Sequence, residues 1–121
     1  MPTVLIVDDA LFMRMMLKDI LTKNGFVVVG EAETGEEAIS KYSALQPDLV
    51  TMDIVMPKTD GIDAVRSIIK LDPKARVVIC SAMGQQSLVQ EALENGACDY
   101  IIKPFSPSKV VEVMSRVAQG G

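Results

Sequence analysis

The residues of this sequence that can do chemistry occur at one kind of position, the end of a short apolar run. The set that shares this position consists of Asp8, Asp9, Asp53, Ser81 and Lys103. If the runs are parallel strands, their carboxyl ends meet at one edge of the sheet, which is where such sheets bind ligands. We therefore expect these five side chains to converge on one site.

Carboxylates that meet at one place repel one another unless a cation neutralises them. Two unit charges about 4 Å apart cost roughly 4 kcal/mol at an effective dielectric constant near 20. Asp8, Asp9 and Asp53 offer only oxygen ligands, which suit Mg²⁺, an ion that often bridges to a phosphate. An aspartate beside Mg²⁺ can take a phosphoryl group as a nucleophile, and Lys103 supplies a positive charge suited to a phosphoryl oxygen. The pattern therefore predicts phosphoryl chemistry with Mg²⁺.

Each of these residues taken alone has an ordinary structural explanation, because aspartates often follow strands as turn residues or helix caps. Five such residues at matching strand ends are much harder to explain in that way, so the set favours a site. Four aspartates outside the set are interpreted as turn or cap residues: Asp60, Asp63, Asp72 and Asp99. Met13 and Met16 are interpreted as core residues.

The place of the site depends on the elements around it. Short runs rich in β-branched residues predict strands at residues 3–7, 27–29, 49–52, 77–80 and 100–102. An amphipathic stretch follows each run, and stop signals such as Asn24-Gly25 and Asn95-Gly96 end two of the predicted helices. This alternation predicts an α/β fold in which five helices cover both faces of a doubly wound, five-stranded parallel sheet.

Three of the predicted helices carry start signals. Thr34 with Glu37 predicts a capping box, and Asp60 predicts a cap for the third helix. Ser106 predicts the cap of the fifth helix, and Pro107 its first position. The fifth helix should bury one apolar stripe, made of Val110, Val113, Met114 and Val117.

Composition limits the partners and the compartment. The chain has 121 residues and a net charge of −4, which suits one domain and disfavours nucleic acid or a membrane surface as partner. No apolar run approaches the ~20 residues that span a bilayer, and the start of the chain lacks a signal-peptide pattern. The absence of histidine excludes serine–histidine catalysis and histidine-ligated metals. We expect a monomeric, cytoplasmic single domain over residues 1–121, with Cys80 in its core and no output domain.

Several short motifs occur together, in order, along essentially the whole chain. They are Val-Asp-Asp at 7–9, Met-Asp-Ile-Val-Met-Pro at 52–57, Gly61, Ser-Ala at 81–82 and Lys-Pro-Phe at 103–105. Each is weak alone, but the combination is specific and resembles the receiver domains of bacterial and archaeal response regulators. The resemblance implies a flavodoxin-like strand order 2-1-3-4-5. It also implies a signalling switch whose only catalysis is its own phosphorylation and slow dephosphorylation.

The resemblance implies a role in phosphoryl binding for each matching residue. Asp53 resembles the family's phosphoacceptor. Lys103 resembles the phosphate-binding lysine, and Ser81 the hydroxyl that turns toward the phosphoryl group. The backbone groups of Val55 and Ala82 are implied to bind the phosphoryl oxygens.

The same resemblance implies a Mg²⁺ site and a conformational switch. Asp9, Asp53 and the backbone carbonyl of Val55 are implied to bind Mg²⁺ directly, and Asp8 through water. Tyr100 resembles the aromatic switch that turns inward when the serine hydroxyl moves. The structural role of Pro104 is implied to be a cis bond from Lys103, an isomer that is a minority among X–Pro bonds.

A narrower resemblance concerns two segments, 9–16 and 80–86, which are similar to those of CheY proteins of the Gram-positive, Thermotoga and archaeal kinds. These are stand-alone chemotaxis response regulators. The resemblance implies a CheA-like histidine kinase as phosphoryl donor and a FliM-like flagellar switch protein, or an archaeal adaptor, as target. A CheC- or CheX-like phosphatase is a further implied partner. A receiver of another two-component pathway or relay is the alternative left open.

Two positions depart from the family pattern. Val55 and Met83, two residues after Asp53 and Ser81, are apolar where relatives often place a polar residue, which puts the lifetime of the phosphoryl group in question. Val55 also counts against a haloacid-dehalogenase-like phosphatase, the enzyme alternative, which would place a second aspartate there.

The output surface is expected on the fourth helix, the fifth strand and the fifth helix. There Val111 falls outside the predicted inward stripe of the fifth helix, so we expect it to be exposed. With Lys109 and Gln90 it would form a small mixed patch for a partner helix or peptide.

Overall fold

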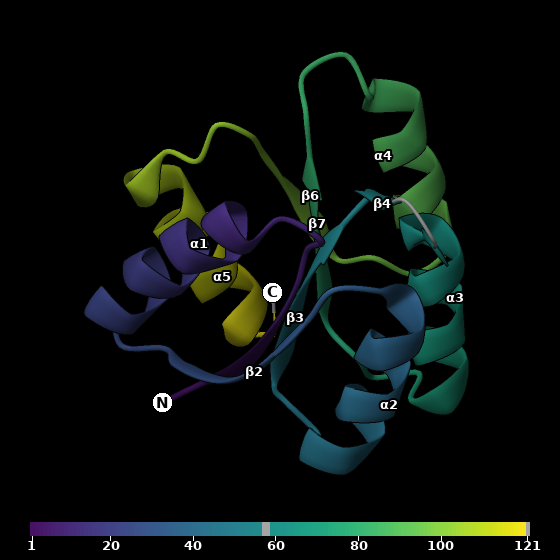
Figure 1. Cartoon of the computed structure of the whole chain (residues 1–121), viewed down its shortest axis with the longest axis horizontal. Helices are drawn as coiled ribbons and strands as arrows, with labels where there is room; N and C mark the ends of the chain where they lie inside the picture. The colour runs from purple at the N-terminus through teal and green to yellow at the C-terminus, as the bar shows by residue number, and fades with distance from the viewer. Residues whose placement is uncertain (57–58, 121) are drawn as a thin grey trace.

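The computed structural model describes residues 1–56 and 59–120 and shows a central sheet with helices on both faces (Figure 1). The strands of this sheet are β1 (Thr3–Val7), β2 (Val27–Ala32), β3 (Leu49–Asp53), β6 (Val77–Ser81) and β7 (Asp99–Ile102). The helices are α1 (Leu11–Lys23), α2 (Gly35–Leu45), α3 (Gly61–Leu71), α4 (Gln86–Glu94) and α5 (Pro107–Ala118). A separate antiparallel pair, β4 (Val55–Met56) and β5 (Thr59–Asp60), was not predicted from the sequence.

The central sheet is parallel throughout, with the strand order β2-β1-β3-β6-β7. This confirms the predicted order 2-1-3-4-5, because β6 and β7 are the fourth and fifth strands of this sheet. The register aligns the carboxyl ends of the strands: Val7 pairs with Met52, Asp53 with Cys80, and Ser81 with Ile102. The strands predicted at 49–52 and 77–80 extend one residue further, so Asp53 and Ser81 end strands instead of beginning loops.

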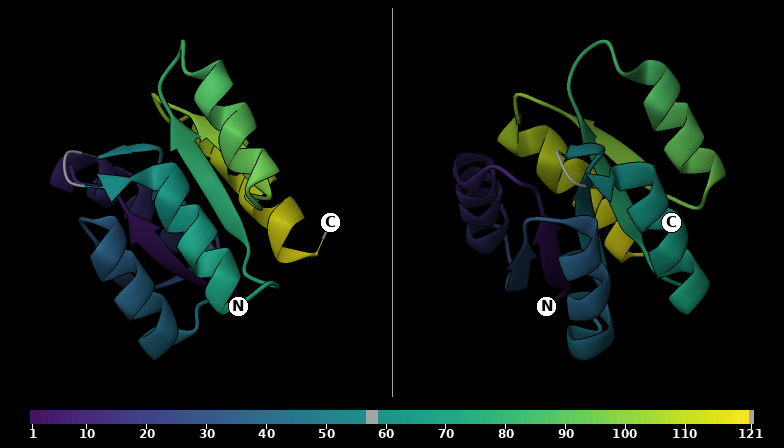
Figure 2. Two further views of the ribbon diagram at one scale, coloured as in Figure 1. Left: turned by 90° about the vertical axis from the view of Figure 1, so that its right-hand side faces the viewer. Right: turned by 45° about the vertical axis from the view of Figure 1, so that its right-hand side comes forward.

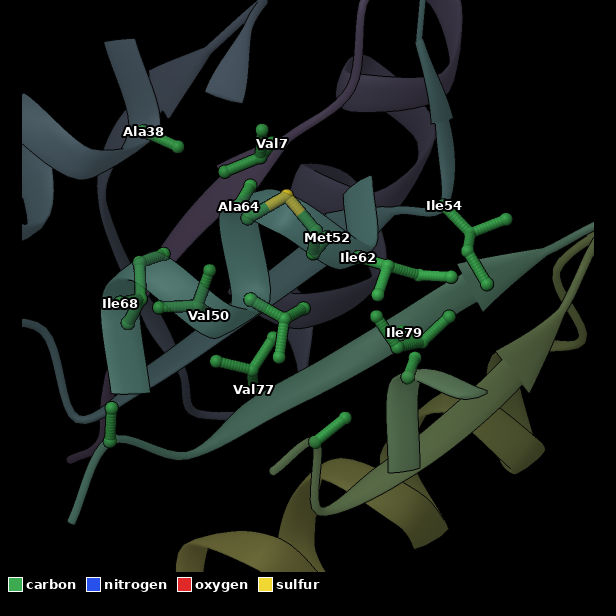
Figure 3. Close-up of a cluster of buried hydrophobic side chains, with 14 of the residues drawn as sticks. Val7, Ala38, Val50, Met52, Ile54, Ile62, Ala64, Ile68, Val77 and Ile79 are labelled. Carbon is green, nitrogen blue, oxygen red and sulfur yellow. The ribbon is translucent and has the colours of Figure 1, made fainter. Parts of the chain in front are cut away.

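Two hydrophobic cores lie on opposite faces of the sheet. Helices α1 and α5 cover one face, and α2, α3 and α4 cover the other (Figures 1 and 2). Successive side chains of a strand point to opposite faces, so Leu5 and Val7 enter one core while Val4 and Ile6 enter the other. Figure 3 shows the core beneath α2–α4, where side chains of the sheet meet those of α3: Val50, Met52, Val77 and Ile79 with Ile62, Ala64 and Ile68.

Two of the predicted helix caps are present. Thr34 Oγ1 accepts a hydrogen bond from the Glu37 backbone N–H at 3.1 Å, and Asp60 Oδ1 accepts one from the Ile62 N–H at 2.8 Å. The Glu37 carboxylate accepts from the backbone N–H of Glu33, one residue before the position that a capping box would use. The helix starts predicted from Thr34 and Asp60 are therefore confirmed.

The start of α5 differs from the prediction. Pro107 opens the helix as expected, but the Ser106 side chain makes no cap hydrogen bond, because its hydroxyl pairs with the Ser108 hydroxyl at 3.3 Å. Val111 is half-buried and packs against the core shared with α1, so its predicted exposure on the output face is wrong. The buried arc of α5 is wider than the predicted stripe because α1 also packs against this helix. The stripe itself is confirmed, with Val110, Val113, Met114 and Val117 all buried.

The remaining core assignments agree with the sequence. Cys80 is buried, and Met13 and Met16 are partly buried against the core beneath α1 and α5. Among the described residues, no helix combines the length and the apolar character that crossing a membrane requires.

Candidate functional site

The predicted convergence of charged side chains at the carboxyl edge of the sheet is confirmed. One carboxylate oxygen each from Asp8, Asp9 and Asp53 lie within 4.8 Å of one another. The Lys103 ammonium donates a hydrogen bond to Asp8 Oδ2 at 2.9 Å and lies 3.4 Å from Asp53 Oδ1. Because β1, β3 and β7 end at the same edge, three separate segments of the chain supply these four groups.

Burial and like charges disfavour the ionised form of Asp53. The residue is only 7% exposed, and its burial together with the negative charge of Asp8 raises its pKa to about 6, although Lys103 opposes this shift. For Lys103, burial acts to lower the pKa, but its hydrogen bond to Asp8 and the charge of Asp53 outweigh burial and raise it. Lys103 is therefore a cation. Asp53 experiences opposing effects, because burial and Asp8 disfavour its ionised form while Lys103 favours it.

The residues present fit a divalent cation. Among the described residues, the three carboxylates face one ammonium, that of Lys103, so acidic groups outnumber basic ones in this cluster. Asp9 is exposed whereas Asp8 and Asp53 are buried, so the cluster opens to solvent on one side. A set of oxygen donors with an open side matches Mg²⁺, which retains several of its waters.

Ser81 brings a buried hydroxyl to the same edge. Its Oγ is buried, the residue being 1% exposed, and finds no hydrogen-bond partner among the described residues. Ser81 stands between the strand of Asp53 and the Lys103 backbone, since the Lys103 N–H donates to the Ser81 carbonyl at 2.7 Å. Thr51 Oγ1, further back in β3, is also buried without a partner among the described residues, so this state alone does not mark a binding site. What distinguishes Ser81 is its place at the strand end beside Asp53 and Lys103.

The two backbone positions expected to bind phosphoryl oxygens lie at the rim of the cluster. Val55 is in β4, two residues after Asp53, and is exposed. The Ala82 N–H follows Ser81 and donates to Oε1 of Gln85 at 2.8 Å. Their binding roles remain predictions, as do those of the side chains around them.

Gly61 fixes the backbone that carries Asp53. A Cβ atom at Gly61 would lie 2.4 Å from the Asp53 carbonyl oxygen and 2.7 Å from that of Ile54, too close for any side chain. The Gly61 N–H donates to the Ile54 carbonyl at 3.2 Å. Glycine at this motif position therefore lets α3 begin directly against the end of β3.

Tyr100 lies beside the site, in a groove of about 560 Å³. This groove is lined by Ser81, the β6–α4 loop (residues 82–85), α4 and β7. The Tyr100 ring is on the outside, 42% exposed, so the aromatic residue predicted to switch is turned outward in this structure. The peptide bond from Lys103 to Pro104 is cis, as expected.

The four aspartates set aside from the site have structural partners. Asp60 caps α3, and Asp72 accepts hydrogen bonds from the Lys74 N–H and the Tyr42 hydroxyl. Asp63 lies within the first turn of α3 and pairs with Arg66, so its assignment as a turn or cap residue is wrong. Asp99 instead begins β7 and pairs with Arg116, so it is neither a turn residue nor a cap.

Sequence reasoning missed Arg14, whose side chain is only 7% exposed. Its Nη1 donates to the Asp8 backbone carbonyl at 2.7 Å, and its Nε donates to Glu31 Oε1 at 3.0 Å. The guanidinium therefore ties the end of β1 to the end of β2. A signal for this was present, because Arg14 falls three residues before Leu17 and in phase with the buried face of α1.

Comparison with known proteins gives a consistent result. The model of the response regulator receiver domain matches residues 4–115. The chain is 60% identical over 116 residues to the chemotaxis protein CheY of Thermotoga maritima, covering 96% of this chain and 97% of that one. It is 58% identical over 113 residues to CheY of Bacillus subtilis, covering 93% and 94% of the two chains.

A solved structure supports the same assignment. The crystal structure of a CheX–CheY–BeF3–Mg²⁺ complex from Borrelia burgdorferi matches with a TM-score of 0.89 and 43% identity, covering 95% of this chain and 88% of that one. Such receivers are signalling switches, which removes the haloacid-dehalogenase-like phosphatase as an interpretation. The chain belongs to the response regulator receiver family, as a phospho-accepting chemotaxis regulator of the CheY type.

Proposed function

We propose that Asp53 is the residue that accepts the phosphoryl group, and that Mg²⁺ assists at the site. The observation that carries this proposal is the cluster of three carboxylates within 4.8 Å of one another beside the Lys103 ammonium, in which burial and the charge of Asp8 raise the pKa of Asp53 to about 6. Asp9, Asp53 and the Val55 carbonyl would hold the ion directly, and Asp8 through water. Bound there, Mg²⁺ neutralises the carboxylates and the charge on the phosphoryl oxygens.

The reaction follows from the placement of these groups. An Asp53 carboxylate oxygen attacks the phosphorus of the donor, the bond from phosphorus to the leaving group breaks, and an acyl phosphate forms. Lys103, already 3.4 Å from Asp53 Oδ1, holds a phosphoryl oxygen by a charge-assisted bond. The buried Ser81 hydroxyl and the N–H groups of Val55 and Ala82 donate to the remaining oxygens.

The Ser81 hydroxyl couples this chemistry to Tyr100. When Ser81 turns toward the phosphoryl group, it vacates space beside β7, and the outward Tyr100 ring turns into it. The phosphoryl group needs only a higher affinity for the inward state to shift the population. The surface so changed comprises α4, β7 and α5.

The proposed partners are those that the resemblance to CheY proteins implies. A CheA-like histidine kinase supplies the phosphoryl group, and the phosphorylated monomer acts in the cytoplasm on a FliM-like flagellar switch protein or an archaeal adaptor. The relative from Borrelia burgdorferi was solved with CheX. A phosphatase of the CheC or CheX class is accordingly proposed to reset this chain.

The test is phosphorylation by acetyl phosphate, read as the mass of the intact protein. We expect one phosphoryl group on the wild type with Mg²⁺ and very little with a chelator. Asp53→Asn should remain unmodified, while Asp60→Asn, which alters a helix cap, should be modified like the wild type. Modification of Asp53→Asn at the native rate, or independence from metal, would refute the assignment.

A further inference from the structure

The β6–α4 loop is closed by an internal hydrogen bond next to the site. The Ala82 N–H, directly after the strand-end Ser81, donates to Oε1 of Gln85 at 2.8 Å. Gly84 makes this return possible, because its φ of +88° turns the chain back in a conformation that other residues rarely adopt. Gln85 stands at the N-cap position of α4, but its side chain makes no cap bond to its own helix. The amide therefore serves the loop and not the helix.

Two adjacent donors at this edge of the site are in opposite states. The Ser81 hydroxyl is buried and finds no hydrogen-bond partner within the described chain. The neighbouring Ala82 N–H is occupied by a neutral side-chain oxygen. Both groups are proposed above to donate to the same phosphoryl group, and Gln85 also lines the groove that contains Tyr100. Phosphoryl binding at Ala82 must therefore break the bond to Gln85.

We propose that Gln85 is a positioning residue that competes with the phosphoryl group for the Ala82 N–H and thereby holds the loop in its unphosphorylated arrangement. This rests on the proposed function of Asp53. A phosphoryl oxygen forms a charge-assisted bond, roughly twice as strong as the neutral bond that it replaces, so the exchange favours the phosphorylated arrangement. The released Gln85 amide then lies at the groove beside Tyr100. Gln85 thus sets the affinity for the phosphoryl group.

Removing the competitor should tighten phosphoryl binding. Loss of one neutral hydrogen bond in the free state raises the affinity about fivefold, which corresponds to about 1 kcal/mol. A purely structural role makes the opposite prediction, because disrupting the loop would misplace the Ala82 N–H and weaken binding. Under the competition model, Gln85→Glu should weaken phosphoryl binding, because a carboxylate accepts the Ala82 N–H more strongly than the amide does and repels the anionic ligand.

The experiment measures beryllofluoride affinity in saturating Mg²⁺, by titration of ¹⁵N-labelled protein and its Ala82 amide resonance. Gln85→Ala and Gln85→Leu should bind about fivefold more tightly than the wild type, and Gln85→Glu more weakly. The controls are Gln86→Ala and Gln86→Glu at the exposed next residue, which should change affinity less than twofold. In the free state the Ala82 resonance should shift in the Gln85 variants only.

Unchanged or weaker binding by both Gln85→Ala and Gln85→Leu would overturn the competition. Failure of the proposed function has a different signature, in which wild type does not bind beryllofluoride or Asp53→Asn binds it equally well. Urea unfolding of each variant shows that binding is compared between folded proteins.

Discussion

Nζ of Lys103 lies closer to Asp8, at 2.9 Å from Oδ2, than to the proposed phosphoacceptor Asp53, at 3.4 Å from Oδ1. In this structure the lysine therefore neutralises the carboxylate cluster and does not bind one residue alone. The same ammonium is proposed to hold a phosphoryl oxygen. Before phosphorylation, the Lys103 ammonium therefore opposes the binding of Mg²⁺ by charge repulsion. After phosphorylation, the same ammonium stabilises the phosphoryl group.

Lys103→Met should change the two affinities in opposite directions. Removing the ammonium leaves more negative charge at the site, so we expect Mg²⁺ to bind about five to ten times more tightly. Beryllofluoride should bind at least tenfold more weakly, because its charge-assisted bond is lost. Calorimetric titration measures both affinities. The matched control is Lys109→Met, an exposed lysine of α5, and weaker Mg²⁺ binding by Lys103→Met would contradict this account.

Asp53 should make the metal-free protein less stable as the pH rises. Its pKa of about 6 in the folded state lies above the ordinary value of 3.8, so the unfolded chain loses its proton first. Stability contributed by the protonated Asp53 is therefore complete below about pH 4 and is lost as the pH rises through about 6. We expect urea unfolding with a chelator to show a loss of about 1 to 2 kcal/mol, allowing for solvent screening.

The comparison that isolates this contribution is Asp53→Asn, which lacks the titrating group but keeps Asp8, Asp9 and Lys103. Between about pH 4 and pH 6, the unfolding free energy of the wild type should fall relative to that of the variant. Saturating Mg²⁺ should remove most of this loss of stability, because the ion binds the folded protein with Asp53 ionised and so stabilises that form. An equal pH dependence in both proteins would show that Asp53 is not the group responsible.

Ser81→Ala should separate stability from switching. The hydroxyl is buried and unpaired within the described residues, so its removal should leave the unfolding free energy unchanged or slightly raised. The chemical-shift change at Tyr100 on adding beryllofluoride should disappear. Thr51→Val is the control, because Thr51 Oγ1 is also buried without a partner in the described chain, yet Thr51 precedes the strand end. Native shifts at Tyr100 in Ser81→Ala would disprove the coupling.

The sheet and the convergence of the charged residues at its edge were predictable from the sequence because both depend on where the strands end. Apolar runs fix where each strand stops, and parallel pairing then places Asp8, Asp53 and Lys103 at one edge regardless of loop detail. The β4–β5 pair escaped prediction because strands of two residues have no measurable period. Val111 was placed wrongly because the burial of a helix flank depends on which helix packs beside it.

Side-chain contacts between loops were beyond the reach of the sequence pattern. The bond from Ala82 to Gln85 depends on the turn made by Gly84, and no spacing rule specifies it. The Arg14 contacts depend on the crossing of α1 over β2. Such contacts can be identified only from the three-dimensional arrangement. An arginine in phase with the buried face of a helix nevertheless indicates that its side chain has buried partners.

Arg14→Met should destabilise the protein and weaken its Mg²⁺ site together. The guanidinium holds the Asp8 carbonyl and the Glu31 carboxylate, so its loss leaves a buried acceptor and a partly buried charge without this donor. We expect a loss of about 2 kcal/mol in urea unfolding and a several-fold lower Mg²⁺ affinity. Arg66→Met, which breaks an exposed pair with Asp63, should cost less than about 1 kcal/mol and leave Mg²⁺ binding intact. Native Mg²⁺ affinity in Arg14→Met would limit Arg14 to a role in folding.

The phosphoryl group on Asp53 should be long-lived because the two positions where relatives often place a polar residue, Val55 and Met83, are apolar here. Val55 and Met83 are 54% and 79% exposed, and neither side chain can orient a water molecule toward the acyl phosphate. General-base positioning contributes roughly a hundredfold where it operates. We expect the double variant Val55→Asn, Met83→Gln to lose its phosphoryl group about tenfold faster, as followed by mass after removal of acetyl phosphate. Met15→Gln, a polar change at an exposed position on α1, should keep the native rate. Loss from the double variant at the native rate or slower would mean that backbone groups alone orient the water.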